Sequence, residues 1–229
     1  MTRTMPEFPV HFNLGAFLSR ESHDLKTPFN HIIGFSRIVL KGQDGPLTDF
    51  QREDITTVYH SGVRALFLIS NLIEVARISR GEKELTLAEI QVNPFIEQAV
   101  ANWKRSNSAR EVQIETRLSM ASPTLYADEA QLRQVVSSLV SYVVEFTKGA
   151  AKVLLELAEE PDWVVMTIQS VGLKSPGQSE LDLEMLGYIS RAYIEQHGGE
   201  IRTREETDEG AVICCALPKR SRVSLTADA

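Results

Sequence analysis

Apolar residues recur at seven-residue intervals near the start of the chain, and this spacing constrains the fold more than any other feature of the sequence. The repeating residues are Leu18, Leu25, Ile32 and Val39. A heptad stripe of this kind is typical of a long helix that packs against another helix, so we expect a helix over about residues 12–41. The stretch 42–46, which contains two glycines and a proline, should end it.

A second long helix is expected directly after this break. Thr48 and Gln51 have the spacing of a capping box, in which each side chain binds the other residue's backbone N–H. Apolar residues continue at helical spacing to about Arg80, and Gly81 should end the helix. The two helices would form an antiparallel hairpin with apolar residues on more than one side. One hairpin cannot bury them all, so we expect two copies to form a homodimeric four-helix bundle.

The rest of the chain alternates between short strands and helices. Strands are expected near residues 84–92, 112–118, 151–158, 163–170, 200–205 and 211–218. Helices are expected from Asn93 (cap) and Pro94 to about Lys104, from a capping box at Asp128 to about Phe146, and from about Leu181 to His197. The pattern predicts an α+β fold with helices on one face of a mixed sheet. We expect a helical hairpin at 1–82, an α/β sandwich at 83–220 and a frayed tail at 221–229.

Composition excludes several classes of function. The 229 residues carry a formal net charge of −7, which argues against a nucleic-acid binder. No apolar run approaches the ~20 residues that span a bilayer, and the first residues do not resemble a signal peptide. The two cysteines, Cys214 and Cys215, make no disulfide framework and favour a cytoplasmic location. The five histidines show no metal-ligand spacing, so no metal site is expected.

The stretch 17–30 carries the most specific chemical signal. His23 is followed directly by Asp24, four residues later by Thr27 and then by Pro28, all inside the first expected helix. A neutral imidazole is nucleophilic near neutral pH, and the neighbouring carboxylate can fix its tautomer or take its proton. Thr27 lies one helical turn after His23 and therefore on the same face.

This run resembles the phosphoacceptor box of two-component sensor histidine kinases, and the likeness extends over nearly the whole chain. The first part resembles their dimerisation and histidine-phosphotransfer (HisKA) domain, and the second resembles their ATP-binding domain of Bergerat (GHKL) type. Residues 128–147 resemble the family's asparagine box in their general pattern. Residues 189–199 similarly resemble its late helix, and residues 210–218 resemble its last strand. The resemblance implies a phosphoryl group on His23, a proton-handling role for Asp24, and a hydroxyl at Thr27 that orients water during dephosphorylation of a response regulator.

The second domain departs from the family where ATP chemistry is expected. The magnesium-ligating asparagine falls at Tyr142, and the preceding asparagine of the box falls at Ser138. The aspartate that reads adenine falls at Ser170, and the glycine turn around the phosphates falls at residues 184–187, beginning with Glu184. Each lost charge-assisted hydrogen bond costs roughly 1.5–3 kcal/mol. We therefore expect no bound cofactor and no autokinase activity. If the protein binds nucleotide in an unusual way, the cofactor would be Mg-ATP.

Three functional hypotheses remain open from sequence. The first is a phosphorelay protein that exchanges a phosphoryl group between His23 and a response-regulator receiver domain, or dephosphorylates that domain. The second is a non-catalytic binding module that pairs with a separate sensor kinase through the hairpin. The third is an active histidine kinase with an atypical nucleotide site. All three predict a protein partner and neither nucleic-acid binding nor membrane insertion.

Overall fold

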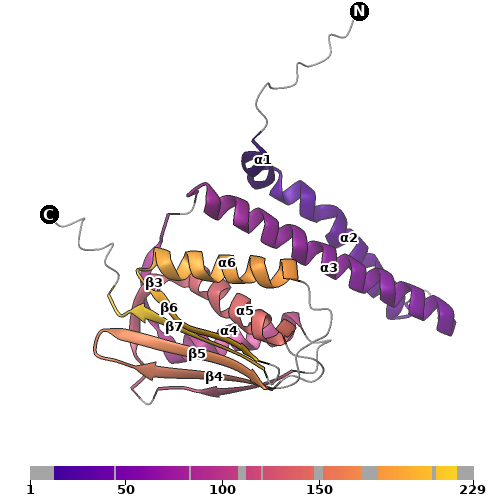
Figure 1. Cartoon of the computed structure of the whole chain (residues 1–229). Helices are drawn as coiled ribbons and strands as arrows, with labels where there is room; N and C mark the ends of the chain where they lie inside the picture. The colour runs from indigo at the N-terminus through magenta and orange to yellow at the C-terminus, as the bar shows by residue number, and fades with distance from the viewer. Residues whose placement is uncertain are drawn as a thin grey trace, which may run out of the picture. The chain divides into compact units, whose positions relative to one another are not determined.

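The computed structural model describes residues 13–43, 45–82, 84–107, 112–119, 121–146, 152–171, 180–207 and 210–220. The chain divides into two compact units, residues 1–83 and 84–229, which we describe separately (Figure 1). The expected frayed tail at 221–229, and residues 172–174 of the segment aligned with the adenine-reading turn, lie outside the described residues.

In its described residues, the first unit contains three helices rather than the two that the sequence predicts. These are α1 (Leu14–Arg20), α2 (Ser22–Leu40) and α3 (Asp49–Ser79). The expected continuous helix over about residues 12–41 is interrupted at Glu21. It begins after Asn13, close to the expected start, and the Asn13 side chain accepts the N–H of Ala16. Glu21 has φ −88° and ψ 14°, outside the helical region, which separates α1 from α2.

The predicted limits of the second helix are confirmed. The Thr48 hydroxyl accepts the N–H of Gln51 at 3.3 Å, and the Gln51 side chain accepts the N–H of Thr48 at 3.0 Å. Both halves of the capping box are therefore formed. At the other end, Gly81 has φ +64° and its N–H donates to the carbonyl of Ile78, which satisfies one of the last helical carbonyls.

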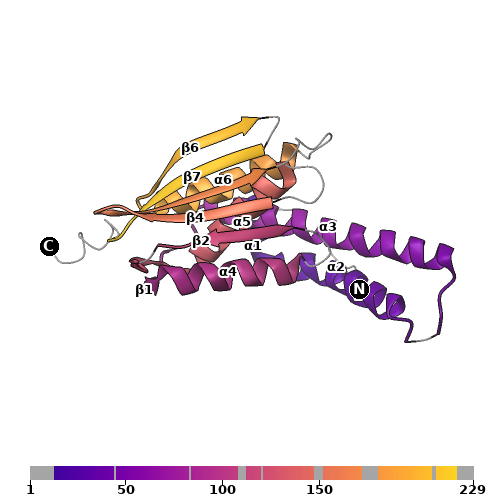
Figure 2. The same ribbon diagram turned by 90° about the horizontal axis from the view of Figure 1, so that it is seen from below.

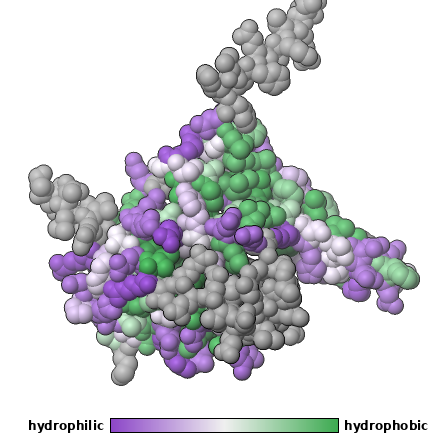
Figure 3. Space-filling model, viewed as in Figure 1, coloured by the Kyte–Doolittle hydropathy of each residue, from purple (hydrophilic) through white to green (hydrophobic). Residues whose placement is uncertain are grey.

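The hairpin has a small core of its own. Leu18 of α1 and Ile73 and Ala76 of α3 are buried, and Leu25 and Ile69 pack against them. Other large apolar side chains of α2 and α3 are exposed on the single chain, including Ile32, Phe35, Ile38, Val58, Val63 and Leu72. Figure 3 shows green apolar surface over the helical unit.

The second unit is built on a five-stranded mixed sheet. Its strands are β2 (Gln113–Arg117), β4 (Lys152–Glu159), β5 (Trp163–Val171), β7 (Gly210–Pro218) and β6 (Glu200–Thr207), in that spatial order. The β2–β4 pair is parallel and the other pairs are antiparallel. Figure 2 shows β6, β7, β4 and β2 following one another in this order.

Three helices cover one face of this sheet: α4 (Val92–Ser106), α5 (Glu129–Phe146) and α6 (Glu180–Gln196) (Figure 1). The predicted α+β sandwich with a mixed sheet is confirmed. Its core is formed where apolar residues of α5 and α6 meet the alternate, inward-facing residues of the strands. Fully buried examples are Val135, Val136, Leu139, Leu155, Ile168, Ile189 and Ile194.

Two local expectations are corrected. The strand β3 (Thr124–Asp128), which pairs antiparallel with β1 (Leu87–Gln91), was not predicted. Asn93 does not cap α4, because the helix already begins at Val92; its side-chain amide instead donates to the carbonyl of Ser119 at 2.7 Å.

Candidate phosphoacceptor site and nucleotide positions

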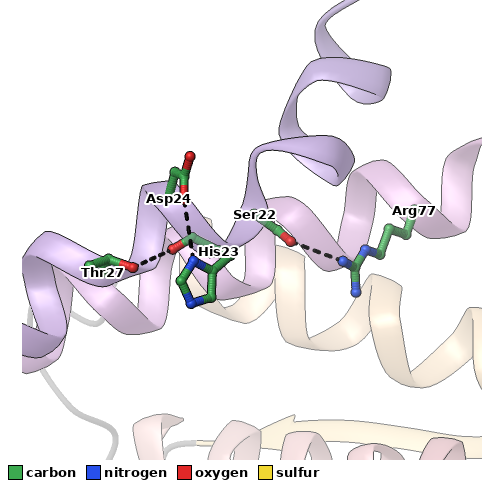
Figure 4. Close-up of polar contacts among 5 residues, drawn as sticks. All are labelled: Ser22, His23, Asp24, Thr27 and Arg77. Carbon is green, nitrogen blue, oxygen red and sulfur yellow. Dashed lines mark hydrogen bonds and ion pairs between the residues drawn. The ribbon is translucent and has the colours of Figure 1, made fainter.

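His23 lies in the first turn of α2, where its side chain is almost fully exposed. The side chains of His23 and Asp24 are 91% and 81% exposed. The His23 Nδ1 atom lies 3.3 Å from an Asp24 carboxylate oxygen (Figure 4). When Nδ1 carries the proton, it donates to Asp24, and the lone pair of Nε2 remains available in solvent. An exposed nucleophilic nitrogen of this kind can accept a phosphoryl group from a large partner.

Thr27 lies one turn further along α2. Its hydroxyl donates a hydrogen bond to the carbonyl oxygen of His23 at 2.9 Å (Figure 4). The hydroxyl oxygen keeps lone pairs that can accept from water. Pro28 follows inside the helix and has no N–H to donate to the carbonyl four residues earlier, which is that of Asp24. Thus the structure places His23, Asp24 and Thr27 within one turn of a helix, as their spacing predicts.

Sequence reasoning missed one contact beside His23. Arg77, in the last turn of α3, donates from Nη2 to the hydroxyl of Ser22 at 3.1 Å (Figure 4). This bond joins the two long helices next to the exposed imidazole. The two partners are 55 positions apart in the sequence, which explains why a local pattern could not reveal the contact.

In the second unit, the two asparagine-box positions are buried in α5. Ser138 and Tyr142 are each 1% exposed. The amide of Gln134 lies 3.3 Å from the Ser138 hydroxyl. The Tyr142 ring packs toward α6, with Cε2 3.8 Å from the point where a Cβ on Gly187 would lie. An aromatic ring therefore fills space next to the expected phosphate-binding segment.

Ser170, the position expected from the resemblance to correspond to the adenine-reading carboxylate, carries a hydroxyl that already has a backbone partner. Ser170 is 4% exposed, and its Oγ accepts the N–H of Ala211 at 3.2 Å. Gly210 has φ +148° and passes so close to Ser170 that a Cβ would lie 2.0 Å from the Ser170 carbonyl oxygen. These contacts join β5 to β7 at the end of the sheet.

Residues 184–187 are helical rather than a glycine turn. They lie in the second turn of α6, which begins at Glu180. The family's phosphate turn works by pointing unpaired backbone N–H groups at the ligand, whereas N–H groups inside a helix donate to carbonyls four residues earlier. Glu180 and Asp182 add negative charge to the first turn.

A cavity of about 660 Å³ lies beside these positions, between α5, α6 and strands β6 and β7. Tyr142 and Gly187 line it, together with Leu139, Leu183 and Ile213. Its charged lining consists of Glu180, Glu184 and Arg191. The volume is in the range of small-molecule sites, but carboxylates outnumber the single guanidinium.

Buried His197 has a structural role in the second unit. Its Nδ1–H donates to the carbonyl of Tyr193 at 2.6 Å, and Nε2 accepts the N–H of Asp128 at 3.0 Å. The Asp128 carboxylate in turn accepts the N–H groups of Gln131 and Thr86. Burial lowers the pKa of His197, so the ring is neutral.

Within the described ranges, no three His, Cys, Asp or Glu side chains are grouped closely enough to hold a metal ion. Among the same residues, no helix is both long and apolar enough to cross a bilayer.

Comparison with known proteins agrees with this geometry. Residues 13–81 match the family of the His Kinase A (phospho-acceptor) domain. The chain thus has histidine kinase architecture, with a HisKA phosphoacceptor domain in its first unit and a GHKL-like sheet in its second.

Particular relatives are found among sensor kinases. The chain is 26% identical over 229 residues to the circadian input-output histidine kinase CikA of Synechococcus elongatus, covering 91% of this chain and 30% of that protein. It is 29% identical over 170 residues to the cell-division control histidine kinase PdhS of Brucella suis, covering 73% of this chain and 16% of that protein. The chain therefore spans less than a third of the length of these two relatives.

Solved structures share the fold. The crystal structure of full-length ShkA in complex with AMPPNP has a TM-score of 0.67 at 23% identity, covering 90% of this chain and 46% of ShkA. The structure of histidine kinase ThkA in complex with the response regulator protein TrrA has a TM-score of 0.58 at 19% identity, covering 91% of this chain and 62% of that one.

Proposed function

We propose that this chain is a cytoplasmic phosphorelay protein that exchanges a phosphoryl group between His23 and an aspartate of a response-regulator receiver domain, without binding ATP itself. The observation that carries the proposal is the contrast between its two units. The first presents an exposed imidazole paired with Asp24. In the second, side chains and helical backbone occupy the positions that bind nucleotide in the family.

Three features support the loss of nucleotide binding. The buried phenol of Tyr142 is a poor ligand for a hard cation such as Mg²⁺, which prefers carboxylate, carbonyl and water oxygens. The Ser170 hydroxyl already accepts a backbone N–H and carries no charge to read an amino group. The backbone of residues 184–187 is helical and offers no free N–H groups to a triphosphate. The residues present therefore do not fit Mg-ATP in the family's mode.

The reaction itself needs no nucleotide. The Nε2 lone pair of His23 attacks the phosphorus of a receiver acyl phosphate, the P–O bond to the aspartate breaks, and the carboxylate leaves with the electron pair. The Nδ1 proton, held by Asp24, can pass to solvent as the phosphoramidate forms. The reverse sequence returns the phosphoryl group to the receiver.

Thr27 serves the dephosphorylating direction in this proposal. Its hydroxyl is anchored by donation to the carbonyl of His23, which leaves the oxygen free to accept from a water molecule. Thr27→Ala should slow hydrolysis of a phosphorylated receiver while leaving labelling of His23 intact. Loss of both activities would instead indicate a damaged helix.

A homodimer is the proposed assembly. Exposed Ile32, Phe35 and Ile38 follow helical spacing along α2, and a second copy would bury them in a four-helix bundle. The structure of ThkA with TrrA shows that a protein of this fold can be bound by a response regulator. That neighbour motivates the choice of a receiver domain as partner.

The decisive experiment has two arms. Calorimetric titration of the purified protein with Mg-ATP to millimolar concentration should give no binding heat, and micromolar binding would restore the autokinase hypothesis. In the second arm, a panel of receiver domains labelled with ³²P-phosphate is incubated with the wild type and with His23→Gln. Acid-labile, base-stable label should transfer to the wild type only.

Signalling that survives in His23→Gln, but not after a charge is placed at Leu25 or Ile32, would favour the non-catalytic binding module instead. That module needs the apolar hairpin surface but not the imidazole. The two variants therefore separate the first and second hypotheses.

A further inference from the structure

The cross-helix bond between Arg77 and Ser22 places a positive charge beside the phosphoacceptor. Ser22 is the first residue of α2 and directly precedes His23. The Arg77 guanidinium reaches it from α3 at 3.1 Å (Figure 4). Successive residues are only ~1.5 Å apart along a helix axis and about 100° apart around it, so Ser22 and His23 start from neighbouring points of the same turn.

The other arginines near this point are already neutralised. Arg20 pairs with the carboxylate of Glu21, and Arg80 pairs with Glu82 at 2.8 Å. Within the described part of the chain, no carboxylate lies at ion-pair distance from Arg77, whose bond goes to a neutral hydroxyl. A guanidinium has five N–H donors, so Arg77 can bind an anion while it keeps one contact to Ser22.

A phosphoryl group on His23 would need such a charge. The phosphoryl dianion would be bonded to Nε2 of the imidazole, while Nδ1 of the same ring lies 3.3 Å from the Asp24 carboxylate. The phosphoryl group on Nε2 would lie across the ring from this carboxylate, and the two negative charges would still repel each other. A guanidinium binds phosphate oxygens in bidentate geometry and would offset this repulsion. The neutral Ser22 hydroxyl is a weak competitor for the same donors.

We propose that Arg77 moves from the Ser22 hydroxyl to the phosphoryl oxygens when His23 is phosphorylated, and so stabilises phosphohistidine. This inference rests on the proposed function of His23 and adds a residue that neither the family match nor the phosphoacceptor box identifies. Arg77 contacts the transferred group directly, and Ser22 holds it near that position in the unmodified protein.

The test uses phosphoramidate as a phosphoryl donor, so that no receiver domain needs to be known. The Nε2 of His23 attacks phosphorus, the P–N bond of the donor breaks, and the Nδ1 proton passes to the released ammonia, which leaves as ammonium. The rate at which phosphohistidine is then lost in buffer is followed by ³¹P NMR. In Arg77→Gln this loss should be about two- to fivefold faster, the effect expected from removing one partly exposed ionic contact.

Matched variants separate charge from packing. Arg77→Lys keeps the charge and should retain most of the wild-type lifetime. Arg80→Gln removes an arginine of the same helix end that is already paired with Glu82, and it should have no effect. The midpoint of the ³¹P shift titration should rise in Arg77→Gln alone, because a bound guanidinium favours the dianionic form; a change in packing would not move this midpoint.

Several outcomes would overturn the inference. One is an equal loss of lifetime in Ser22→Ala and Arg77→Gln, since Arg77 would then act only through the helix contact. Another is an unchanged lifetime in Arg77→Gln together with a shortened one in Lys26→Gln, the cation one turn after His23. If the folded wild type takes up no phosphate at His23, the proposed function is contradicted. If the wild type is labelled but Arg77→Gln has the wild-type lifetime, only the role of Arg77 is contradicted.

Discussion

The Tyr142 ring lies against the backbone of Gly187, with Cε2 3.8 Å from the position of an absent Cβ. By the resemblance described above, Tyr142 falls at the expected position of the family's metal-binding asparagine, and Gly187 ends the segment expected to form its phosphate turn. The ring is thus close enough that a side chain at position 187 would touch it. This contact carries the first prediction.

Tyr142→Asn should restore the family residue without restoring nucleotide binding. The substitution removes a fully buried ring, and we expect a loss of about 3 kcal/mol of unfolding free energy. Mg-ATP should still give no heat in calorimetry, because residues 184–187 remain helical. Tyr188→Asn is the control, since that ring lines the same cavity but is 43% exposed. Micromolar binding of Mg-ATP to the Tyr142 variant would show that one side chain alone controls the site.

The protein should become less stable as the pH is lowered, because the unfolded state takes up a proton at His197 more readily than the folded state does. The unfolded imidazole takes up a proton near its ordinary pKa of 6.5, whereas burial lowers the pKa in the folded state. Below about pH 6.5 the unfolded state therefore binds more protons, and stability is progressively lost as pH falls towards the folded pKa. Protonation of Nε2 would also remove the acceptor of the Asp128 N–H.

Urea unfolding at pH 7.5 and pH 5.5 measures this effect. His197→Gln should be less stable than the wild type at pH 7.5 and should show a smaller difference between the two pH values. His60→Gln, at an exposed position of α3, should retain the wild-type difference. An unaltered pH difference in the His197 variant would mean that other groups cause it.

Gly210→Ala should be strongly destabilising. Its φ of +148° is rarely adopted by other residues, and a Cβ would lie 2.0 Å from the Ser170 carbonyl oxygen. Because the obstacle is backbone, β5 and β7 would have to separate, and we expect a cost of about 3 kcal/mol or more. Gly34→Ala is the matched control: no atom lies within 4 Å of its Cβ position, and the helix should gain up to about 1 kcal/mol. Thermal unfolding by circular dichroism compares the two.

Phe35→Glu should shift the proposed dimer towards monomer. Phe35 is 68% exposed on the single chain and lies between Ile32 and Ile38 along the apolar face of α2. Burying an unpaired carboxylate in a bundle core is costly, so light scattering should show a mass near that of one chain at micromolar concentration. Lys41→Glu, at an exposed position just after α2, should leave the mass unchanged. A wild type that is already monomeric would contradict the assembly directly.

Periodic, locally encoded features were predictable from sequence. The capping box of Thr48 and Gln51 and the end of α3 at Gly81 depend on residues close together in the chain, and they were found as expected. Apart from β3, the order of strands and helices in the second unit likewise follows from alternating and helical apolar patterns. The grouping of His23 with Asp24 and Thr27 follows from helical spacing alone.

Features that depend on distant partners were not predictable. Strand β3 is only five residues long and is defined by pairing with β1, more than thirty residues earlier. The position of Asn93 in the sequence predicts a helix cap, but its side-chain amide donates to the carbonyl of Ser119 in another segment. Arg77 reaches Ser22 across two helices. In each case the deciding contact is tertiary and leaves no local pattern.

The helical backbone at residues 184–187 also bears on how such a chain could change over generations. If nucleotide binding has been lost as proposed, regaining it would require descendants to unwind the first two turns of α6, replace Tyr142 and place a carboxylate at Ser170. Under that proposal, each change alone would disturb buried or helical structure without completing a nucleotide site, which would leave selection no gradual path. Drift away from nucleotide use would in this way act as an evolutionary ratchet, leaving selection to act on the phosphoacceptor hairpin and on its partners.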